Sequence, residues 1–295
     1  MKANSLFKDF CAFACGQLAS GDIDPTYPVL KRFYRVEKLS REQALWRTVL
    51  YLAWYDLGSA ERIWRKYPNP FLPTDSEVRG LSTGTERRSF RGNTKVLDFL
   101  GALLSRASLE GGSLEKWVDS FFVDDPTKGW DRAREELQEL AFAGPWASYK
   151  WADLLKHVHD APITASDIGV GGRGETAGPI PGMVRLTGLP WQECANDVKK
   201  QVALLKRAQD AGVPFNGLDQ LETALCDFNS LCKGGYYVGH DIDTQMKHLE
   251  HVKDRGLWDA RVVFEDRFRG EVSGGWFGVR KELKTLYRDQ KVLIT

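Results

Sequence analysis

The stretch A-L-C-D-F-N-S-L-C-K-G-G-Y-Y-V-G-H-D-I-D-T-Q-M-K-H-L-E-H, residues 224–251, is expected to organise the chain. Apolar residues at helical spacing lead into it and predict a helix: Leu218, Leu221, Leu225 and Phe228. Two glycines, at positions 234 and 235, interrupt this helix because they permit backbone conformations that other residues resist. A second helical pattern follows over residues 242–252. Between the two helices we expect a cluster of titratable side chains, which comprises Asp227, Lys233, His240, Asp241 and Asp243.

The composition indicates a folded protein with little net charge. Of the 295 residues, 42% are hydrophobic and 12% aromatic, which supports a substantial core and excludes a disordered chain. The formal net charge of +1 excludes a wholly basic binder, so a nucleic-acid surface has to be a local patch. The five cysteines have unrelated spacings and form no zinc pattern, which indicates reduced thiols. No apolar run approaches the roughly 20 residues of a membrane-spanning helix, so we expect a soluble cytoplasmic protein with no membrane partner.

Helical periodicity dominates the chain and predicts a mainly α fold. We expect a single helical domain over residues 1–295, with a subdivision near residues 160–190 as the alternative. Ser40, with Gln43 three residues on, forms a capping-box pattern that opens the strongest N-terminal helix. The expected helices span residues 1–20, 41–56, 59–64, 95–104, 113–122, 131–143, 145–159 and 191–211.

The segments between these helices are expected to be irregular. Residues 21–28 predict a turn, and a basic and aromatic segment follows at residues 31–35. Residues 160–190 are rich in glycine and proline and predict a long internal loop. The C-terminal tail is expected to be small and mixed, with a strand at residues 261–264 and a last helix at residues 279–288.

The glycine-rich loop matches two nucleotide-binding motifs by letter, but neither is expected to form a nucleotide-binding site. Gly169, Gly171 and Gly174 match G-x-G-x-x-G, but a dinucleotide site needs a strand before the motif and a helix after it. Prolines at 179 and 181 are expected to prevent that helix. The same glycines nearly spell a phosphate-binding loop, with a glutamate in place of the required lysine. What remains is a loop long enough to suggest a function, and it carries Arg173.

A local basic patch is found in residues 79–95. This loop has one acid, Glu86, against five basic residues: Arg79, Arg87, Arg88, Arg91 and Lys95. Serines and threonines are interleaved with them, and arginine forks match phosphate oxygens in a bidentate manner. A solvated loop with no ligand is the simpler interpretation, but the charge excess favours contact with phosphate or nucleic acid. The 10 tryptophans and 9 tyrosines offer surfaces on which an exposed base can stack, although most are expected in the core.

The remaining polar residues have simple structural interpretations beside the functional ones. Asp241 and Asp243 form a D-x-D pair that is either a metal site or the cap of the following helix. His240 beside them is either a proton shuttle or a buried structural imidazole. His157 and His159 lie near an expected helix end, where an imidazolium is favoured by the helix dipole. No metal ligand set is predicted anywhere in the chain.

Three segments carry a resemblance to a known family. They are W-R-T-V-L-Y-L-A-W-Y-D-L-G-S-A-E-R-I-W (46–64), G-P-W-A-S-Y-K-W-A-D-L-L (144–155) and A-L-C-D-F-N-S-L-C-K-G-G-Y-Y-V-G-H-D-I-D (224–243). Over roughly residues 24–250 the chain resembles phage amino acid:DNA transferases, also called α-glutamyl/putrescinyl thymine pyrophosphorylases, which are related to helical DNA glycosylases. The resemblance implies a helical glycosylase-like bundle. One departure is that I-P-G-M-V at 180–184 only loosely matches the compact DNA-anchoring hairpin of those glycosylases.

The resemblance also implies a reaction on double-stranded DNA. A phosphorylated or pyrophosphorylated 5-hydroxymethyluracil, flipped out of the stack, would exchange its leaving group for the amine of an amino acid or polyamine. Asp227, Asp241 or Asp243 would deprotonate the amine, and Lys233 would neutralise the leaving oxygen. The DNA and phosphate contacts would come from Arg79, Arg87, Arg88, Arg91, Lys95, Lys150 and Arg173. No redox cofactor is implied; a divalent cation held by one carboxylate is an alternative.

Two other functions remain open at this point. One is a DNA glycosylase that acts on a modified base and leaves an abasic site. The other is a phage DNA-binding or assembly protein without catalysis, which would use the same basic loop but none of the acids.

Overall fold

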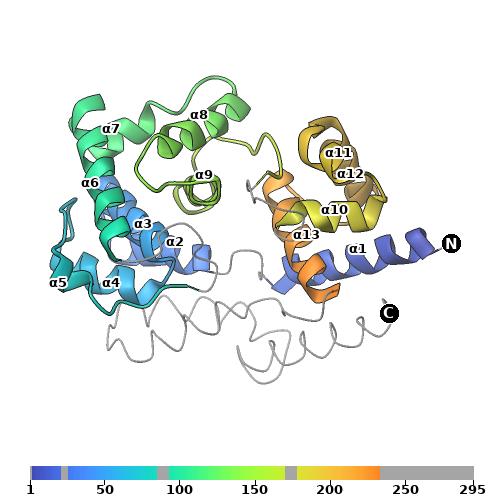
Figure 1. The fold of residues 1–295 in the computed structure, drawn as a ribbon, viewed down its shortest axis with the longest axis horizontal. Coiled ribbons are helices and arrows are strands. Elements are labelled where there is room, and N and C mark those ends of the chain that lie inside the picture. Colours follow the sequence, from blue (N-terminus) through green and yellow to red (C-terminus); the bar gives the residue numbers. More distant parts are fainter. Residues whose placement is uncertain (1, 21–25, 85–92, 170–177, 233–295) are drawn as a thin grey trace. The chain divides into compact units, whose positions relative to one another are not determined.

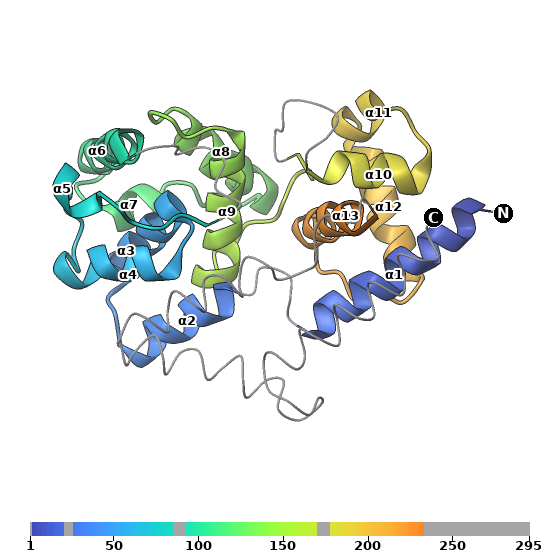
Figure 2. The ribbon, with the colours of Figure 1, turned by 60° about the horizontal axis from the view of Figure 1, so that its bottom comes forward.

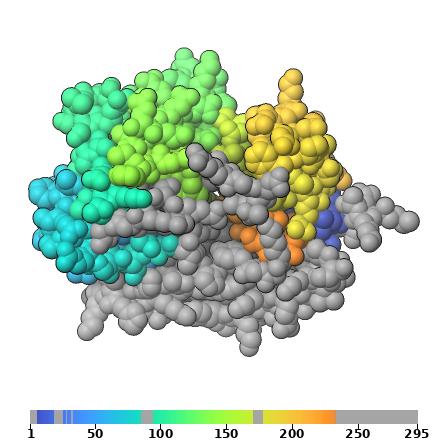
Figure 3. All heavy atoms as spheres, viewed as in Figure 1, coloured from blue at the N-terminus to red at the C-terminus, as the bar shows by residue number. Residues whose placement is uncertain are grey.

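The structure is a computed structural model that describes residues 2–20, 26–84, 93–169 and 178–232. These residues form thirteen helices and no strand, which confirms the mainly α prediction (Figure 1). Figure 3 shows the heavy atoms of the chain in the same view, with the other residues in grey. The expected helix over 242–252, the strand at 261–264 and the last helix at 279–288 lie outside the described residues. No described helix has the length and apolarity needed to cross a membrane.

The chain divides into two compact units, with a boundary between Thr164 and Ala165. The described part of the first, the α2–α9 unit, is residues 26–164 without 85–92. The described part of the second, the α10–α13 unit, combines residues 2–20 with residues 165–169 and 178–232. The boundary falls in the region where the sequence suggested a subdivision, and the number of domains stays a prediction.

The α2–α9 unit is built around two buried helices, α3 and α9. Helix α3 packs on α4, α6, α7 and α9, and α9 packs in addition on α2 and α8 (Figure 2). Five tryptophans with almost no exposed surface fill the space between them: Trp46, Trp54, Trp117, Trp130 and Trp151. The helices of this unit are α2 (Thr26–Val36), α3 (Arg41–Trp54), α4 (Leu57–Lys66), α5 (Asp75–Val78), α6 (Asn93–Glu110), α7 (Leu114–Asp119), α8 (Pro126–Gln138) and α9 (Pro145–His159).

Helix α3 begins as its sequence predicts. The Ser40 hydroxyl accepts from the Gln43 backbone N–H (3.3 Å), and the Gln43 side chain accepts from the Ser40 N–H (3.2 Å). Between them, the Glu42 carboxylate accepts from the backbone N–H groups of Leu114 (3.0 Å) and Glu115 (2.7 Å). The first turn of α3 therefore satisfies free N–H groups at its own start and at the start of α7.

A buried ion pair joins α3 to α4. The Arg47 Nε donates to Glu61 Oε2 at 2.9 Å, and both residues are almost completely buried. The guanidinium lies 4.3 Å from the ring centroid of Phe33, so the charge is stabilised by both a carboxylate and an aromatic face. Helical periodicity gives no signal for this pair, because it places a charge where an apolar residue is expected.

The α10–α13 unit packs four other helices around or beside α13. Helix α13 contacts α1, α10 and α12, and α11 contacts α10 and α12. The predicted apolar face of α13 is confirmed, since Leu218, Leu221, Leu225 and Phe228 are all buried. Phe10 and Phe13 of α1 lie against Phe228, with ring centroids 5.4 and 5.5 Å away. The helices of this unit are α1 (Lys2–Ser20), α10 (Pro179–Thr187), α11 (Trp191–Asn196), α12 (Val198–Asp210) and α13 (Leu218–Cys232).

Prolines lie in the first turn of two helices that were not predicted from the sequence. Helix α10 begins at Pro179 and includes Pro181, where the prolines were expected to prevent a helix, and it occupies the last part of the predicted loop at 160–190. Helix α2 includes Pro28 in its first turn, where a turn was predicted. The reason is the same in both cases: N–H groups of the first turn have no intrahelical partner, so proline loses nothing there. The dinucleotide motif remains excluded because no strand precedes it in residues 160–169.

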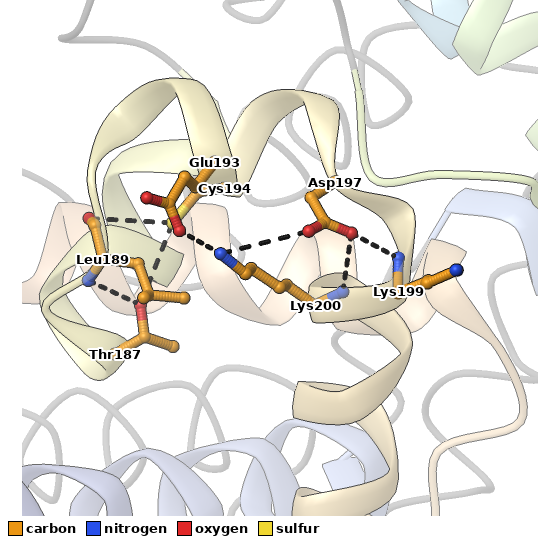
Figure 4. A network of polar contacts seen from close by, with 7 residues as sticks. All are labelled: Thr187, Leu189, Glu193, Cys194, Asp197, Lys199 and Lys200. Carbon is orange, nitrogen blue, oxygen red and sulfur yellow. Dashed lines mark hydrogen bonds and ion pairs between the residues drawn. The ribbon is translucent and has the colours of Figure 1, made fainter.

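Aspartate caps set two other boundaries that the periodicity missed. The expected single helix over 191–211 is broken at Asp197, whose carboxylate accepts from the N–H groups of Lys199 (3.1 Å) and Lys200 (3.4 Å) and so starts α12 (Figure 4). Helix α8 begins at Pro126 rather than at 131, because Asp125 caps it in the same way.

One glycine determines how closely α10 and α13 pack. A Cβ atom added at Gly182 would lie 2.3 Å from the backbone oxygen of Leu225. Real Cβ atoms do not approach a carbonyl oxygen so closely, and backbone cannot move aside cheaply. The contact between α10 and α13 therefore requires glycine at this position.

We expect Gly182→Ala to lower the free energy of unfolding by at least about 2 kcal/mol, because the added methyl forces the two helices apart. Gly101→Ala is the matched control, since a Cβ there meets only the Leu72 side chain at 3.7 Å. It should be neutral or stabilising by up to about 1 kcal/mol, as alanine favours helix. Urea denaturation followed by circular dichroism measures both, and equal stability of the two variants would contradict the close approach.

Candidate functional site

Helix α9 carries a polar stripe on an otherwise apolar, central helix. It begins at Pro145 after Gly144 and ends at His159, the range that the sequence predicts. Trp146, Lys150, Asp153 and His157 follow one another at steps of four, three and four residues, so they share one face. The other faces of the helix are occupied by buried, mostly apolar residues. The polar stripe on this otherwise apolar helix is the candidate functional site.

The centre of the stripe is the Asp153 carboxylate, whose polar neighbours include Tyr27, Lys150 and His157. Its Oδ2 accepts from the hydroxyl of Tyr27 on α2 at 3.0 Å and lies 3.5 Å from the Lys150 ammonium. Its Oδ1 lies 3.4 Å from the Nε2 atom of His157. Asp153 is 2% exposed and Lys150 is 5% exposed, so both charges are withdrawn from water.

Withdrawing two charges from water costs free energy that their attraction only partly returns. The Tyr27 hydroxyl and the Lys150 ammonium offset part of this cost by donating to the same oxygen of Asp153. The arrangement can do acid–base chemistry: the carboxylate can accept a proton, and the ammonium can neutralise negative charge that develops beside it.

Aromatic side chains lie along the same face of α9. The Tyr27 ring is stacked with the His157 ring, with centroids 6.2 Å apart. The Trp146 ring meets Tyr55 edge to face at 5.0 Å, and Tyr55 lies 4.9 Å from Tyr51. Tyr55 ends α3 in the left-handed conformation (φ 49°), which is uncommon for a bulky residue. Trp146 is partly exposed, whereas Tyr51 and Tyr55 are buried in the core beside α9.

Asp153 and His157 also offer ligand atoms of a kind that a divalent cation accepts. The Lys150 ammonium lies 3.5 Å from Oδ2 of the same carboxylate and would repel a cation bound at that oxygen. The stripe therefore combines potential ligand atoms with a buried ammonium.

The phosphate-binding residues predicted from the sequence differ in their surroundings. Arg79 is exposed and donates to Asp75 at 2.8 Å. Lys95 is exposed, with its ammonium 5.5 Å from the ring centroid of Phe142. Lys150 is instead buried beside Asp153, so it belongs to the α9 stripe and not to an open basic surface. The other four residues of this set lie outside the described residues: Arg87, Arg88, Arg91 and Arg173.

Of the predicted catalytic cluster, Asp227 is the member that the structure describes. It lies on α13, is half-buried, and accepts from the Gln17 side chain on α1 at 2.6 Å. Lys233, His240, Asp241 and Asp243 lie outside the described residues. The convergence of these acids with Lys233 stays a prediction.

Asp153 and Tyr27 were not among the site residues predicted from the sequence. The pattern W-x3-K-x2-D-x3-H over residues 146–157 was a usable signal, because it places four polar or aromatic groups on one face of an otherwise apolar helix. Tyr27 had no such signal, since it is 126 positions away from Asp153 in the chain.

His159, the last residue of α9, is a neutral structural histidine. Its Nε2 lies 2.8 Å from the Thr48 hydroxyl, which is also 2.8 Å from the Tyr34 hydroxyl. Because Thr48 donates to the Ala44 carbonyl (3.0 Å), it accepts from the other two groups. Burial, with a smaller effect from nearby Arg41, lowers the pKa of His159 to about 3. The expected imidazolium at this helix end is therefore wrong for His159.

The lowered pKa of His159 predicts a pH-dependent stability. The unfolded histidine takes up a proton below a pKa of about 6.5, whereas the folded one does so only near 3. The contribution of neutral His159 to the free energy of unfolding is complete above pH 6.5. It is lost as the pH falls from 6.5 towards 3. We expect the stability difference between wild type and His159→Gln to shrink between pH 7 and pH 5, measured by urea denaturation. A difference that stays constant would contradict a neutral buried imidazole.

Comparison with known proteins identifies the family of this chain. A model described as "Amino acid:DNA transferase" matches residues 74–237, more than half of the chain. The match includes the basic loop, the stripe on α9 and Asp227, whereas Tyr27 lies before it. A search of the curated proteins found no match. The family name indicates a transferase that acts on DNA with an amino acid, and the chain belongs to the amino acid:DNA transferase family.

Proposed function

We propose that this chain replaces the phosphate or pyrophosphate of a phosphorylated 5-hydroxymethyluracil in double-stranded DNA with the amine of an amino acid or polyamine. Membership of the amino acid:DNA transferase family supports transfer to DNA. The resemblance to thymine pyrophosphorylases supports the choice of base and leaving group. A phage origin stays a prediction from the same resemblance, and a cytoplasmic location stays a prediction from the cysteines and the lack of a long apolar run.

The reaction is a substitution at the C5-methylene carbon of the base. A carbon–nitrogen bond to the amine forms, and the carbon–oxygen bond to the phosphate or pyrophosphate breaks. The amine arrives as an ammonium and has to lose a proton before it is a nucleophile, while the leaving oxygen gains negative charge. The base has to leave the helical stack for this carbon to be reached, at a cost of a few kcal/mol.

The observation that carries this proposal is the buried Asp153 carboxylate with Lys150 beside it, within the residues that match the family. Asp153 would take the proton from the ammonium, and Lys150 would neutralise the leaving oxygen. The partly exposed Trp146 ring would lie against the flipped pyrimidine. The rival base is one of Asp227, Asp241 and Asp243, with Lys233 in the place of Lys150.

We expect Asp153→Asn to lower amine incorporation by at least about 100-fold, the usual contribution of a general base. The assay incubates the protein with duplex DNA carrying phosphorylated 5-hydroxymethyluracil and a mixture of amino acids and polyamines, followed by mass analysis of the nucleosides. Asp160→Asn is the matched control, because Asp160 follows α9 and is exposed, with an ion pair to Lys31. It should keep wild-type activity.

Asp227→Asn in the same assay compares the two candidate bases. Full activity of Asp153→Asn, with loss in Asp227→Asn, would assign the base to the rival cluster. Abasic sites without new nucleosides would indicate a glycosylase, and DNA binding without any product would indicate a non-catalytic protein.

A further inference from the structure

A loop joins α4 to α5 (Figure 1), and two of its apolar side chains are exposed to solvent. It reads Y-P-N-P-F-L-P over residues 67–73. Phe71 is 51% exposed and Leu72 is 42% exposed, although each is of a type that normally lies inside a protein. Adjacent exposed side chains of this size mark a surface that another molecule covers more often than isolated ones do.

The exposed tip is held rigid from below. The Phe71 ring stacks on the Tyr67 ring, with centroids 4.4 Å apart and planes 21° apart. Tyr67 is fixed at both ends: its carbonyl accepts from the Trp46 indole at 2.9 Å, and its hydroxyl donates to Glu77 at 2.7 Å. Three prolines restrict the backbone, and one of them, Pro73, is buried. A side chain held in this way loses little conformational freedom when it inserts into a partner.

Positive charge flanks the tip on the helix that leads into it. Arg62, Arg65 and Lys66 are exposed in the last turns of α4. The basic loop of residues 79–95 follows the tip in the chain. Three acids lie nearby in ion pairs: Glu61 with Arg65, Glu77 with Lys66 and Asp75 with Arg79. Arg65 and Lys66 would therefore exchange these carboxylates for phosphates on binding. An apolar tip with cations beside it complements the stacked bases and phosphates of DNA, since proteins that kink DNA insert apolar wedges between base steps.

We propose that Phe71 and Leu72 form a wedge that inserts between base pairs of duplex DNA while Arg62, Arg65 and Lys66 contact the adjacent phosphates. The choice of DNA as the partner rests on the proposed function. Partial unstacking beside the target would lower the cost of flipping the modified base.

The test uses the full-length protein and duplexes that carry 2-aminopurine, whose fluorescence rises when it is unstacked. The wild type should raise the emission of a 2-aminopurine next to the bound site, in duplexes with and without the phosphorylated base. Phe71→Ala and Leu72→Ala should abolish this rise and weaken binding about tenfold, the usual effect of removing one stacking side chain. Phe71→Trp should keep both properties, because a larger ring still stacks.

Leu109→Ala is the control for loss of an exposed apolar side chain, since Leu109 is 84% exposed in α6 of the same unit. It should bind and unstack DNA as the wild type does, and circular dichroism should show that all variants are folded. Wild-type binding and emission in Phe71→Ala and Leu72→Ala would overturn the wedge. So would a wild-type dimer that these substitutions dissociate without affecting DNA binding, because the tip would then be a protein interface. Neither readout needs catalysis, so a missing transfer product would count against the proposed function alone.

Discussion

The burial of a carboxylate and an ammonium on the central helix α9 is the constraint on which the proposed chemistry depends. Asp153 and Lys150 lie on the one polar stripe of a helix whose other faces are packed against the core. Apolar residues of similar size would fill the same space without the cost of removing two charges from water. A fold that keeps both charges there, beside the Tyr27 hydroxyl and several aromatic rings, keeps a group that can move a proton in a nearly dry environment.

The same unit contains a second buried ion pair, and the contrast between the two is informative. Arg47 and Glu61 join α3 to α4, and the guanidinium is covered by the Phe33 ring. Arginine keeps its proton at any physiological pH. Burial by itself lowers the pKa of Arg47, but the negative charge of Glu61 outweighs this and raises the pKa overall. That pair can hold two helices together but cannot exchange a proton. Lysine, tyrosine and histidine around Asp153 are all groups that can donate one, which is why we place the chemistry on α9.

The sequence predicted the helices whose signals are local, such as caps and apolar spacing. It did not predict features that depend on a residue distant in the chain or on an unusual partner. Helices α3 and α9 and the apolar face of α13 follow from caps and apolar spacing. Helix α10 did not, because proline was treated as a breaker where it occupies a first turn. The site followed the same division: Lys150 was singled out as a phosphate ligand, but its burial beside Asp153 depends on how α2, α3 and α9 pack. Hydrophobic periodicity in the sequence does not indicate how these helices pack against one another.

The most direct test of a chemical role for the buried stripe is the free energy of unfolding of the triple variant Tyr27→Phe, Lys150→Met, Asp153→Leu. We expect this variant to be as stable as the wild type, or up to about 4 kcal/mol more stable, because well-packed apolar residues commonly match or exceed a buried ion pair. It should also be inactive in transfer. A variant that is several kcal/mol less stable than the wild type would contradict this and show that the three polar groups are retained to hold the fold together.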